Sequence, residues 1–290
     1  MAQSLSNLVG VCSWSLEPKT PEDLVERLRA CRVRAVQLAL DPIGAFRWRA
    51  DETSSRLRAA GIRIASGMVG CKGEDYSTLE TIRQTGGIRP DATWDDNRKA
   101  AEHNAIVAQR FGVHLVTLHA GFLPHESSDP ERVKMLDRLA ELASIFAARH
   151  VRLGLETGQE SADTLLGVLG ELHARGGAAA SVGVNFDPAN MILYAMGDPV
   201  AALRKLAPHV VQIHIKDALP TSKPGEWGSE VPAGKGAVDW PAFFAVVRQT
   251  GLLTRGVPFM VEREAGSDRV NDLRAGAELA LAMLEQPQLA

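Results

Sequence analysis

Residues 182–187 read Val182-Gly183-Val184-Asn185-Phe186-Asp187, a short apolar run that ends in a carboxylate. Runs of this kind recur along the chain and alternate with longer amphipathic stretches, a pattern typical of βα units that build a parallel sheet. The runs lie at residues 8–13, 35–40, 62–69, 113–119, 151–156, 182–187, 210–216 and 257–262. Eight such runs predict a (β/α)8 TIM barrel of the α/β class.

Each predicted strand is followed by a stretch whose apolar residues have helical spacing. The first of these begins with Thr20 and Pro21, an N-cap residue followed by a proline suited to the first helical turn. The predicted helices cover residues 21–31, 51–60, 94–111, 130–150, 162–175, 199–206, 241–250 and 269–284. Because no repeat, low-complexity tract or linker divides the chain, we predict a single domain over residues 1–290.

The composition limits the classes of partner. Hydrophobic residues make up 45% and charged residues 23%, and the net charge is −3 with Lys and Arg spread along the chain, which argues against nucleic acid. No segment approaches the ~18 unbroken apolar residues of a membrane span, and residues 1–7 carry no positive charge ahead of an apolar stretch. With three cysteines and no CxxC pair, we expect a cytoplasmic protein without membrane contact.

Four predicted strands carry a side chain that can bind a metal at or near their carboxyl ends. These side chains are Glu156, Asp187, His214 and Glu262. In each strand the residues one and three positions earlier are bulky and apolar, so they face the helix layer. The four polar side chains therefore point toward the barrel axis, where neighbouring strands lie ~4.8 Å apart. We expect three carboxylates and one imidazole to converge there.

A cation would compensate the repulsion among these carboxylates, which otherwise raises their pKa values. Oxygen-rich coordination with one nitrogen favours a single divalent metal ion, with Mn2+ as first choice and Mg2+, Co2+ or Zn2+ as alternatives. Each residue also has an ordinary structural interpretation: a buried Glu can be half of an ion pair, an Asp can cap a helix, and a His can be a satisfied core residue. Capping is the strongest alternative for Asp187, because Pro188 follows it.

The motifs around these residues resemble the xylose isomerase-like TIM barrel family, which includes sugar phosphate isomerases and epimerases, ketohexose 3-epimerases and inosose dehydratase. The resemblance covers essentially the whole chain. Its most specific motifs are Gly154-Leu155-Glu156, Phe186-Asp187-Pro188-Ala189-Asn190, His214-Ile215-Lys216-Asp217 and the stretches 234–240 and 261–266. The resemblance implies that Glu156, Asp187, His214 and Glu262 bind the metal, and that Glu156 and Glu262 are also the catalytic residues that move the substrate proton.

Departures from the family pattern bear on the substrate. Ketohexose epimerases carry a His and an Arg at the positions of Asn190 and Pro220, so the resemblance does not imply plain ketohexose epimerase activity. The His-x-Lys-Asp run looks more like the inosose dehydratase branch; by parity Lys216 points inward, although it could instead pair with Asp217. Endonucleases of the same superfamily hold three zinc ions, but their full ligand set cannot be assembled from this chain.

Further residues are candidates for contact with the substrate. The predicted substrate-binding residues are Trp14, His119, Asn190 and Lys216, and plain core packing is the alternative for Trp14 and His119. Two long connections, residues 70–93 and 217–239, follow strands and could close over a ligand with Tyr76 and Trp227. The run Gly234-Lys235-Gly236 could cradle a phosphate or simply form a turn.

We therefore predict a metal-dependent isomerase or epimerase that acts on a ketose, ketose phosphate or keto-polyol. The metal would polarise the carbonyl, and one glutamate would abstract the neighbouring proton. Loss of a β-hydroxyl after proton abstraction would instead make the protein a lyase of the inosose dehydratase type. The same residues would also suit a metal-dependent hydrolase or a non-catalytic sugar-binding barrel. The expected partner is a small sugar-derived molecule, and family members often pair, so a homo-oligomer is also expected.

Overall fold

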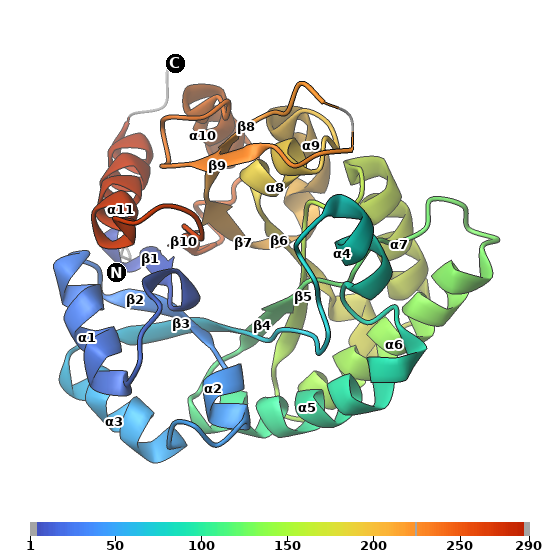
Figure 1. The fold of residues 1–290 in the computed structure, drawn as a ribbon, viewed down its shortest axis with the longest axis horizontal. Helices are drawn as coiled ribbons and strands as arrows, with labels where there is room; N and C mark the ends of the chain where they lie inside the picture. Colours follow the sequence, from blue (N-terminus) through green and yellow to red (C-terminus); the bar gives the residue numbers. More distant parts are fainter. Residues whose placement is uncertain (1–4, 224, 287–290) are drawn as a thin grey trace.

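The computed structural model describes residues 5–223 and 225–286, so residues 1–4 of the N-terminal segment considered above lie outside it. Its strands close into a parallel barrel in the order β1-β10-β7-β6-β5-β4-β3-β2, with helices around the outside (Figure 1). The barrel strands are β1 (Val9–Cys12), β2 (Ala35–Ala39), β3 (Arg63–Met68), β4 (Leu115–Leu118), β5 (Arg152–Glu156), β6 (Gly183–Phe186), β7 (Val210–Ile215) and β10 (Phe259–Val261). The predicted (β/α)8 barrel is confirmed, with one strand in each predicted run.

Every predicted helical stretch contains a helix of the outer layer. These helices are α1 (Pro21–Ala30), α3 (Ala50–Ala59), α5 (Asp91–Arg110), α6 (Pro130–Ala147), α7 (Ala162–Ala174), α9 (Pro199–Leu206), α10 (Trp240–Gln249) and α11 (Arg269–Glu285). The start of α1 follows the predicted capping: Thr20 Oγ1 accepts the Asp23 N–H at 3.2 Å, and Pro21 is the first helical residue.

Three short helices and a hairpin lie at the carboxyl ends of the strands and were not predicted. They are α2 (Asp41–Gly44), α4 (Leu79–Thr85), α8 (Pro188–Leu193) and the antiparallel pair β8 (Asp217–Leu219) and β9 (Ser229–Val231). The hairpin lies against α8 (Figure 1). A buried cluster that includes Ile82 of α4, Leu193 of α8 and Ala218 of β8 joins α4, α8 and the hairpin. These three elements therefore build one wall above the barrel mouth.

Aromatic side chains fill part of the layer between the barrel and the helices. Phe186 of β6 packs on Phe243 of α10 with ring centroids 5.9 Å apart, and Phe259 of β10 stacks on Phe244 at 5.7 Å. All four side chains are fully buried, and each such burial stabilises the fold by roughly 1.5–3 kcal/mol. Phe186 and Phe259 face outward as parity predicts, which turns their neighbours Asp187 and Met260 toward the axis.

Directly below the candidate site, one layer of the barrel interior is polar. Gln37 Nε2 donates to Thr117 Oγ1 at 2.8 Å, and Gln212 Nε2 donates to Gln37 Oε1 at 2.8 Å. Gln212 Nε2 also lies 3.1 Å from Asn185 Oδ1, and Ser66 donates to Gln212 Oε1 at 2.5 Å. All five residues are buried, so this network is a polar floor that joins five strands beneath the candidate site.

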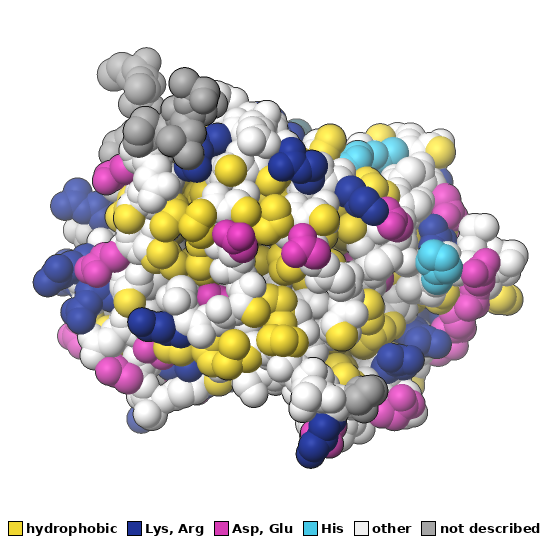
Figure 2. Space-filling view, turned by 90° about the horizontal axis from the view of Figure 1, so that it is seen from above, with side chains coloured by type: hydrophobic (Ala, Val, Ile, Leu, Met, Phe, Trp, Pro, Cys, Tyr) yellow, Lys and Arg dark blue, Asp and Glu magenta, His cyan; other side chains and the backbone are white. Residues whose placement is uncertain are grey.

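On the face shown in Figure 2, hydrophobic side chains occupy much of the middle, and several Lys and Arg side chains gather at the left edge. None of the helices in the described part of the chain has the length and apolar sequence required to cross a bilayer.

Candidate active site

The carboxyl ends of β5, β6, β7 and β10 bring together all four predicted metal ligands. Each of Glu156, Asp187, His214 and Glu262 is buried and offers a ligand atom within 4.8 Å of the others. Nδ1 of His214 lies at the middle of the group. It is 3.3 Å from Glu156 Oε1, 3.5 Å from Asp187 Oδ2 and 3.2 Å from Glu262 Oε2.

The donor atoms of this cluster fit a cation. Asp187 Oδ2, His214 Nδ1 and Glu262 Oε2 are buried without a hydrogen-bond partner among the described residues, an arrangement that is costly unless a ligand pairs with them. Burial raises the pKa of Asp187 to about 6, as expected for a buried carboxylate without a bound cation. Three carboxylates and one imidazole suit a hard or borderline divalent ion.

Asp187 combines the two functions that the sequence left as alternatives. Its Oδ1 accepts the Asn190 N–H at 2.9 Å and so caps the N-terminus of α8. Its Oδ2 makes no such bond and faces His214 Nδ1. The cap fixes the carboxylate in an orientation that leaves one oxygen free for a metal.

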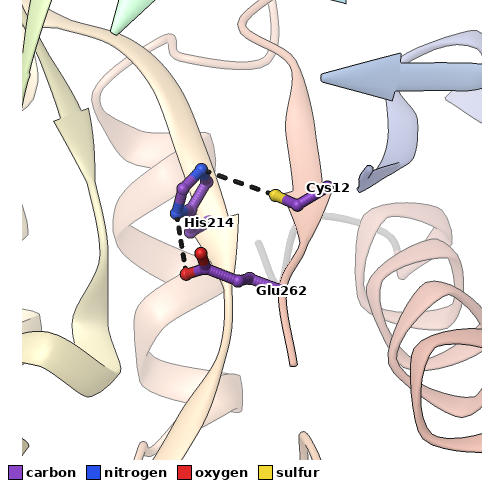
Figure 3. Close-up of side chains that lie close together, drawn as sticks. All are labelled: Cys12, His214 and Glu262. Atoms are coloured by element: carbon purple, nitrogen blue, oxygen red, sulfur yellow. Dashed lines mark hydrogen bonds and ion pairs between the residues drawn. The ribbon is translucent and has the colours of Figure 1, made fainter. Parts of the chain in front are cut away.

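A second group of potential ligands shares His214 but lies on its other nitrogen. Cys12 Sγ lies 3.7 Å from His214 Nε2, whereas Glu262 lies beside Nδ1 (Figure 3). Burial raises the pKa of the Cys12 thiol to about 12, so it stays protonated. Because Gln37 Oε1 already lies 2.7 Å from Nε2, the carboxylate side of the ring is the better candidate for a metal.

Glu156 is held by two amide groups. Asn185 Nδ2 donates to its Oε2 at 3.0 Å, and Asn190 Nδ2 donates to its Oε1 at 3.1 Å. Burial acts to raise the pKa of Glu156, but the neighbouring His119 and His214 outweigh it and lower the pKa. Glu156 is therefore ionised at neutral pH and can accept a proton.

Glu262 is held in the same state by different groups. Trp14 Nε1 donates to Glu262 Oε1 at 2.7 Å, and Lys216 Nζ lies 3.1 Å from Oε2, an ion-pair distance without an aligned hydrogen bond. Although burial acts in the opposite direction, Lys216 and His214 lower the pKa of Glu262 well below its usual range. Both glutamates are thus buried carboxylates that are ionised at neutral pH and able to accept a proton.

Two cationic or potentially cationic groups flank the pair. His119 Nε2 lies 3.5 Å from Glu156 Oε1; burial lowers its pKa, but the carboxylates of Glu156 and Glu74 raise it above the ordinary value. Lys216 Nζ donates to Glu264 Oε2 at 2.8 Å. Despite its burial, Glu262 and Glu264 raise the pKa of Lys216 well above normal, so Lys216 stays charged.

The alternative pairing of Lys216 with Asp217 is wrong. Asp217 Oδ2 instead accepts the Gly234 N–H at 2.9 Å and Trp240 Nε1 at 3.0 Å, and Oδ1 accepts the Val238 N–H at 3.2 Å. The turn that contains Gly234 therefore wraps around a carboxylate of the chain itself. The N–H of Gly234 that a phosphate would need is already engaged.

A cavity of about 460 Å³ opens above the cluster. Its lining includes every predicted substrate-binding residue and both loop aromatics: Trp14, Tyr76, His119, Asn190, Lys216 and Trp227. The sequence interpretation did not single out six further lining residues, Asp41, Glu74, Leu193, Tyr194, Glu230 and Glu264. Their common signal is position, since all lie in segments after strand ends, where barrels carry their active sites.

Fold and site together define a β/α barrel with a buried acidic cluster under a cavity at the carboxyl ends of its strands. The chain matches the family described as xylose isomerase-like TIM barrel over residues 25–286, and it belongs to that family. The solved xylose isomerase domain protein from Planctomyces limnophilus is 32% identical, over 89% of this chain and 91% of that chain, with a TM-score of 0.80.

More distant structures share the fold. A xylose isomerase-like TIM barrel protein from Mycobacterium smegmatis, solved in complex with magnesium, is 17% identical over 95% of this chain and 96% of that chain, with a TM-score of 0.69. An L-ribulose 3-epimerase is 16% identical over 97% and 99%, with a TM-score of 0.65. Among curated proteins, the uncharacterized protein YihM of Escherichia coli K12 is 50% identical over 48 residues, which are only 17% of this chain and 14% of that protein.

Proposed function

We propose that this chain is a divalent-metal-dependent isomerase or epimerase that moves a proton on the carbon next to the carbonyl of a sugar-derived ketone. The observation that carries the proposal is the pair of ionised glutamates, Glu156 and Glu262, on either side of two buried ligand atoms without hydrogen-bond partners among the described residues, Asp187 Oδ2 and His214 Nδ1. A divalent cation bound there, with Mn2+ as first choice, would polarise the carbonyl and acidify the adjacent C–H.

The glutamates reach the centre from two directions. Glu156 ends β5 and Glu262 follows β10, and β6 and β7 separate these strands in the barrel. One carboxylate takes the proton and becomes a carboxylic acid, which can return that proton to the neighbouring carbon and so give isomerisation. For epimerisation the other carboxylate must first take a proton from solvent or from a substrate hydroxyl, and it then delivers this proton to the opposite face of the same carbon. Trp14 and Asn190 orient the carboxylate oxygens for this transfer.

Because Lys216 is charged, its role in the reaction differs from that of the two glutamates. A permanently protonated lysine cannot act as a base, but it can stabilise negative charge that develops on a substrate oxygen. The magnesium bound by the Mycobacterium smegmatis protein and the epimerase activity of the L-ribulose enzyme support a metal-dependent sugar reaction, although a shared fold hosts many reactions.

Deuterium exchange tests the proposal directly. The protein loaded with Mn2+ would be incubated in D2O with ketoses, ketose phosphates and inososes, and deuterium in recovered substrate and product would be measured by mass spectrometry. We expect incorporation at the carbon next to the carbonyl for at least one compound, and a loss of roughly 10²–10⁴-fold in Glu156→Gln and Glu262→Gln. Glu26→Gln, an exposed carboxylate of α1, is the matched control and should exchange at the rate of the unaltered protein.

Dehydration is the second candidate. Lys216, charged and 3.1 Å from Glu262, lies where it could neutralise a departing hydroxyl. A product that has exchanged deuterium and lost water would move the assignment to a lyase. Absence of exchange with every compound, despite bound metal, would overturn the proposal and favour a hydrolase or a non-catalytic sugar-binding protein.

A further inference from the structure

The wall of the cavity is strongly acidic. Outside the metal cluster, four carboxylates line it: Asp41, Glu74, Glu230 and Glu264. Lys216 is the one lysine among the described lining residues, and no arginine lines the cavity. A ligand that enters therefore meets an excess of negative charge above the cluster.

The one lysine of the described lining already pairs with carboxylates of the protein. Lys216 Nζ lies 2.8 Å from Glu264 Oε2, 3.1 Å from Glu262 Oε2 and 3.8 Å from Glu230 Oε2, and its side chain is only 4% exposed. Arg263, which does not line the cavity, donates to the far oxygen of Glu230 at 2.7 Å. Lys216 is therefore shared among three glutamates, and little of its charge remains to compensate the full charge of a substrate phosphate or carboxylate. His119, the other potential cation of the described lining, lies 3.5 Å from the Glu156 carboxylate and is paired in the same way.

The other two carboxylates are fixed by the backbone alone. Asp41 Oδ2 accepts the Gly70 N–H at 3.0 Å. Glu74 Oε1 accepts the Gly87 N–H at 3.0 Å, and Glu74 Oε2 accepts the Cys71 N–H at 3.3 Å. Neither carboxylate forms an ion pair with a described Lys, Arg or His. The backbone hydrogen bonds hold both carboxylates in place at the cavity wall, so these side chains cannot turn away from an incoming anion.

The remaining lining suits an uncharged polyol. Tyr194 and Trp227 meet edge to face with centroids 4.8 Å apart, and Trp14 and Tyr76 add further aromatic surface on which the C–H face of a sugar can pack. Trp227 Nε1 is buried without a partner in the described part of the chain. An N–H donor that lacks an acceptor beside an aromatic wall is suited to a hydroxyl or carbonyl oxygen.

We propose that the site selects an uncharged polyhydroxylated ketone and rejects phosphorylated and carboxylated sugars through the fixed charge of Asp41 and Glu74, while Glu264 keeps the charge of Lys216 paired. This inference rests on the function proposed above and names the charge class of its substrate. The physical cause is electrostatic, because carboxylates that line a poorly hydrated cavity repel an anion. In addition, no unpaired lysine or arginine of the described lining offsets the free-energy cost of removing the anion from water.

Pairs of ketones, each with one uncharged and one phosphorylated or carboxylated member, test the selection. The Mn2+-loaded protein would be given D-fructose and D-fructose 6-phosphate, D-xylulose and D-xylulose 5-phosphate, and an inosose against 3-dehydroshikimate. Deuterium exchange reports turnover, and a thermal-shift titration with the same compounds reports binding. We expect the uncharged member of a pair to exchange at least about tenfold faster, with the difference shrinking as salt screens the wall.

A second experiment removes one carboxylate charge at a time from the cavity wall. Glu74→Gln and Glu264→Gln keep the size of the side chain, and we expect each to reduce the preference for the uncharged member by about tenfold. Glu26→Gln, remote from the cavity on α1, should leave the preference unchanged. Because the readout is a ratio between two substrates of one protein, a general loss of activity or folding does not imitate the result.

The outcomes separate the two proposals. A phosphorylated or carboxylated compound that exchanges as fast as its uncharged partner overturns the charge selection and leaves the proton-transfer function in place. Absence of exchange with all compounds overturns the function. In that case, selective stabilisation by uncharged polyols in the thermal-shift arm still supports the charge selection, whereas stabilisation by anions, or by none of the compounds, overturns it as well.

Discussion

Gln37 Oε1 lies 2.7 Å from Nε2 of His214, at the floor of the candidate metal centre. The Gln37 amide is oriented by its own bond to Thr117 Oγ1 at 2.8 Å, which fixes its oxygen toward the imidazole. His214 Nε2 also lies 3.0 Å from Asn185 Nδ2, but the contact with Gln37 is the shorter one. Since an amide oxygen only accepts, Gln37 favours the tautomer of a neutral His214 in which Nε2 carries the proton and Nδ1 offers its lone pair to a cation among the three carboxylates.

Loss of this acceptor should weaken metal binding. We expect Gln37→Leu to reduce the affinity for Mn2+ by about 10- to 100-fold, because His214 then loses the bond that fixes its tautomer and ring orientation. Gln37→Glu keeps an acceptor and should retain most of the affinity. Isothermal titration calorimetry measures both, with circular dichroism of the metal-free proteins as the folding control. An unchanged Mn2+ affinity in Gln37→Leu would contradict the assigned tautomer.

Asp187 and Asp198 allow capping to be separated from metal binding. Both cap short helices, Asp187 through Asn190 N–H and Asp198 through Ala201 N–H, and asparagine is an equally good cap. We expect Asp187→Asn to lose Mn2+ affinity with little change in the melting temperature of the metal-free protein. Asp198→Asn should change neither property. Retention of full Mn2+ affinity by Asp187→Asn would remove Asp187 from the ligand set.

The burial of Glu160 leads us to expect that the stability of the protein depends on pH. It is buried, has no hydrogen bond or ion pair to another described residue, and burial raises its pKa from 4.5 to about 8. The unfolded chain ionises Glu160 at the lower pKa and the folded chain resists ionisation, so the free energy of unfolding falls as pH rises from about 4.5 toward 8. Below that range Glu160 is neutral in both states and carries no penalty.

Glu160→Gln removes this penalty. We expect the variant to be more stable by about 4 kcal/mol near pH 8 and to match the unaltered protein near pH 4. Urea unfolding at a series of pH values measures the difference. A gain that does not depend on pH would show that the ionisation of Glu160 is not its cause.

Gly87 and Gly112 have the same backbone conformation but different surroundings. Their φ angles are +65° and +66°, and a Cβ on Gly87 would lie 2.1 Å from backbone atoms of Ala120, whereas one on Gly112 meets nothing within 4 Å. We expect Gly112→Ala to cost about 1–2 kcal/mol from left-handed strain alone.

Gly87→Ala should cost several kcal/mol more, since the backbones must separate. Because the Gly87 N–H donates to Glu74, the substitution should also move a carboxylate of the cavity wall. Denaturant unfolding of the two variants measures the comparison. Equal losses of stability would show that the chain at Gly87 can move aside freely.

Much of the site follows from strand periodicity. Side chains alternate between the two faces of a strand, so the apolar neighbours of Asp187 and His214 were enough to predict which way the ligands point. The same parity applies to Asn185 and Gln212, two residues earlier, and it could have identified the polar floor. The short helices α4 and α8 carry too few turns to show a period of their own, and they are stabilised by a shared buried cluster that includes Ile82 and Leu193.

The sequence by itself determined the barrel, the family and the four inward-facing candidate metal ligands, because hydrophobic periodicity and strand ends are local properties of the chain. Only the tertiary structure decided that Lys216 pairs with Glu264, 48 residues away, and that Asp217 is enclosed by the turn containing Gly234. It also decided the charge of the cavity wall. Such partners depend on strand stagger and loop paths, which are set by packing across the whole fold and leave no periodic signal in the residues themselves.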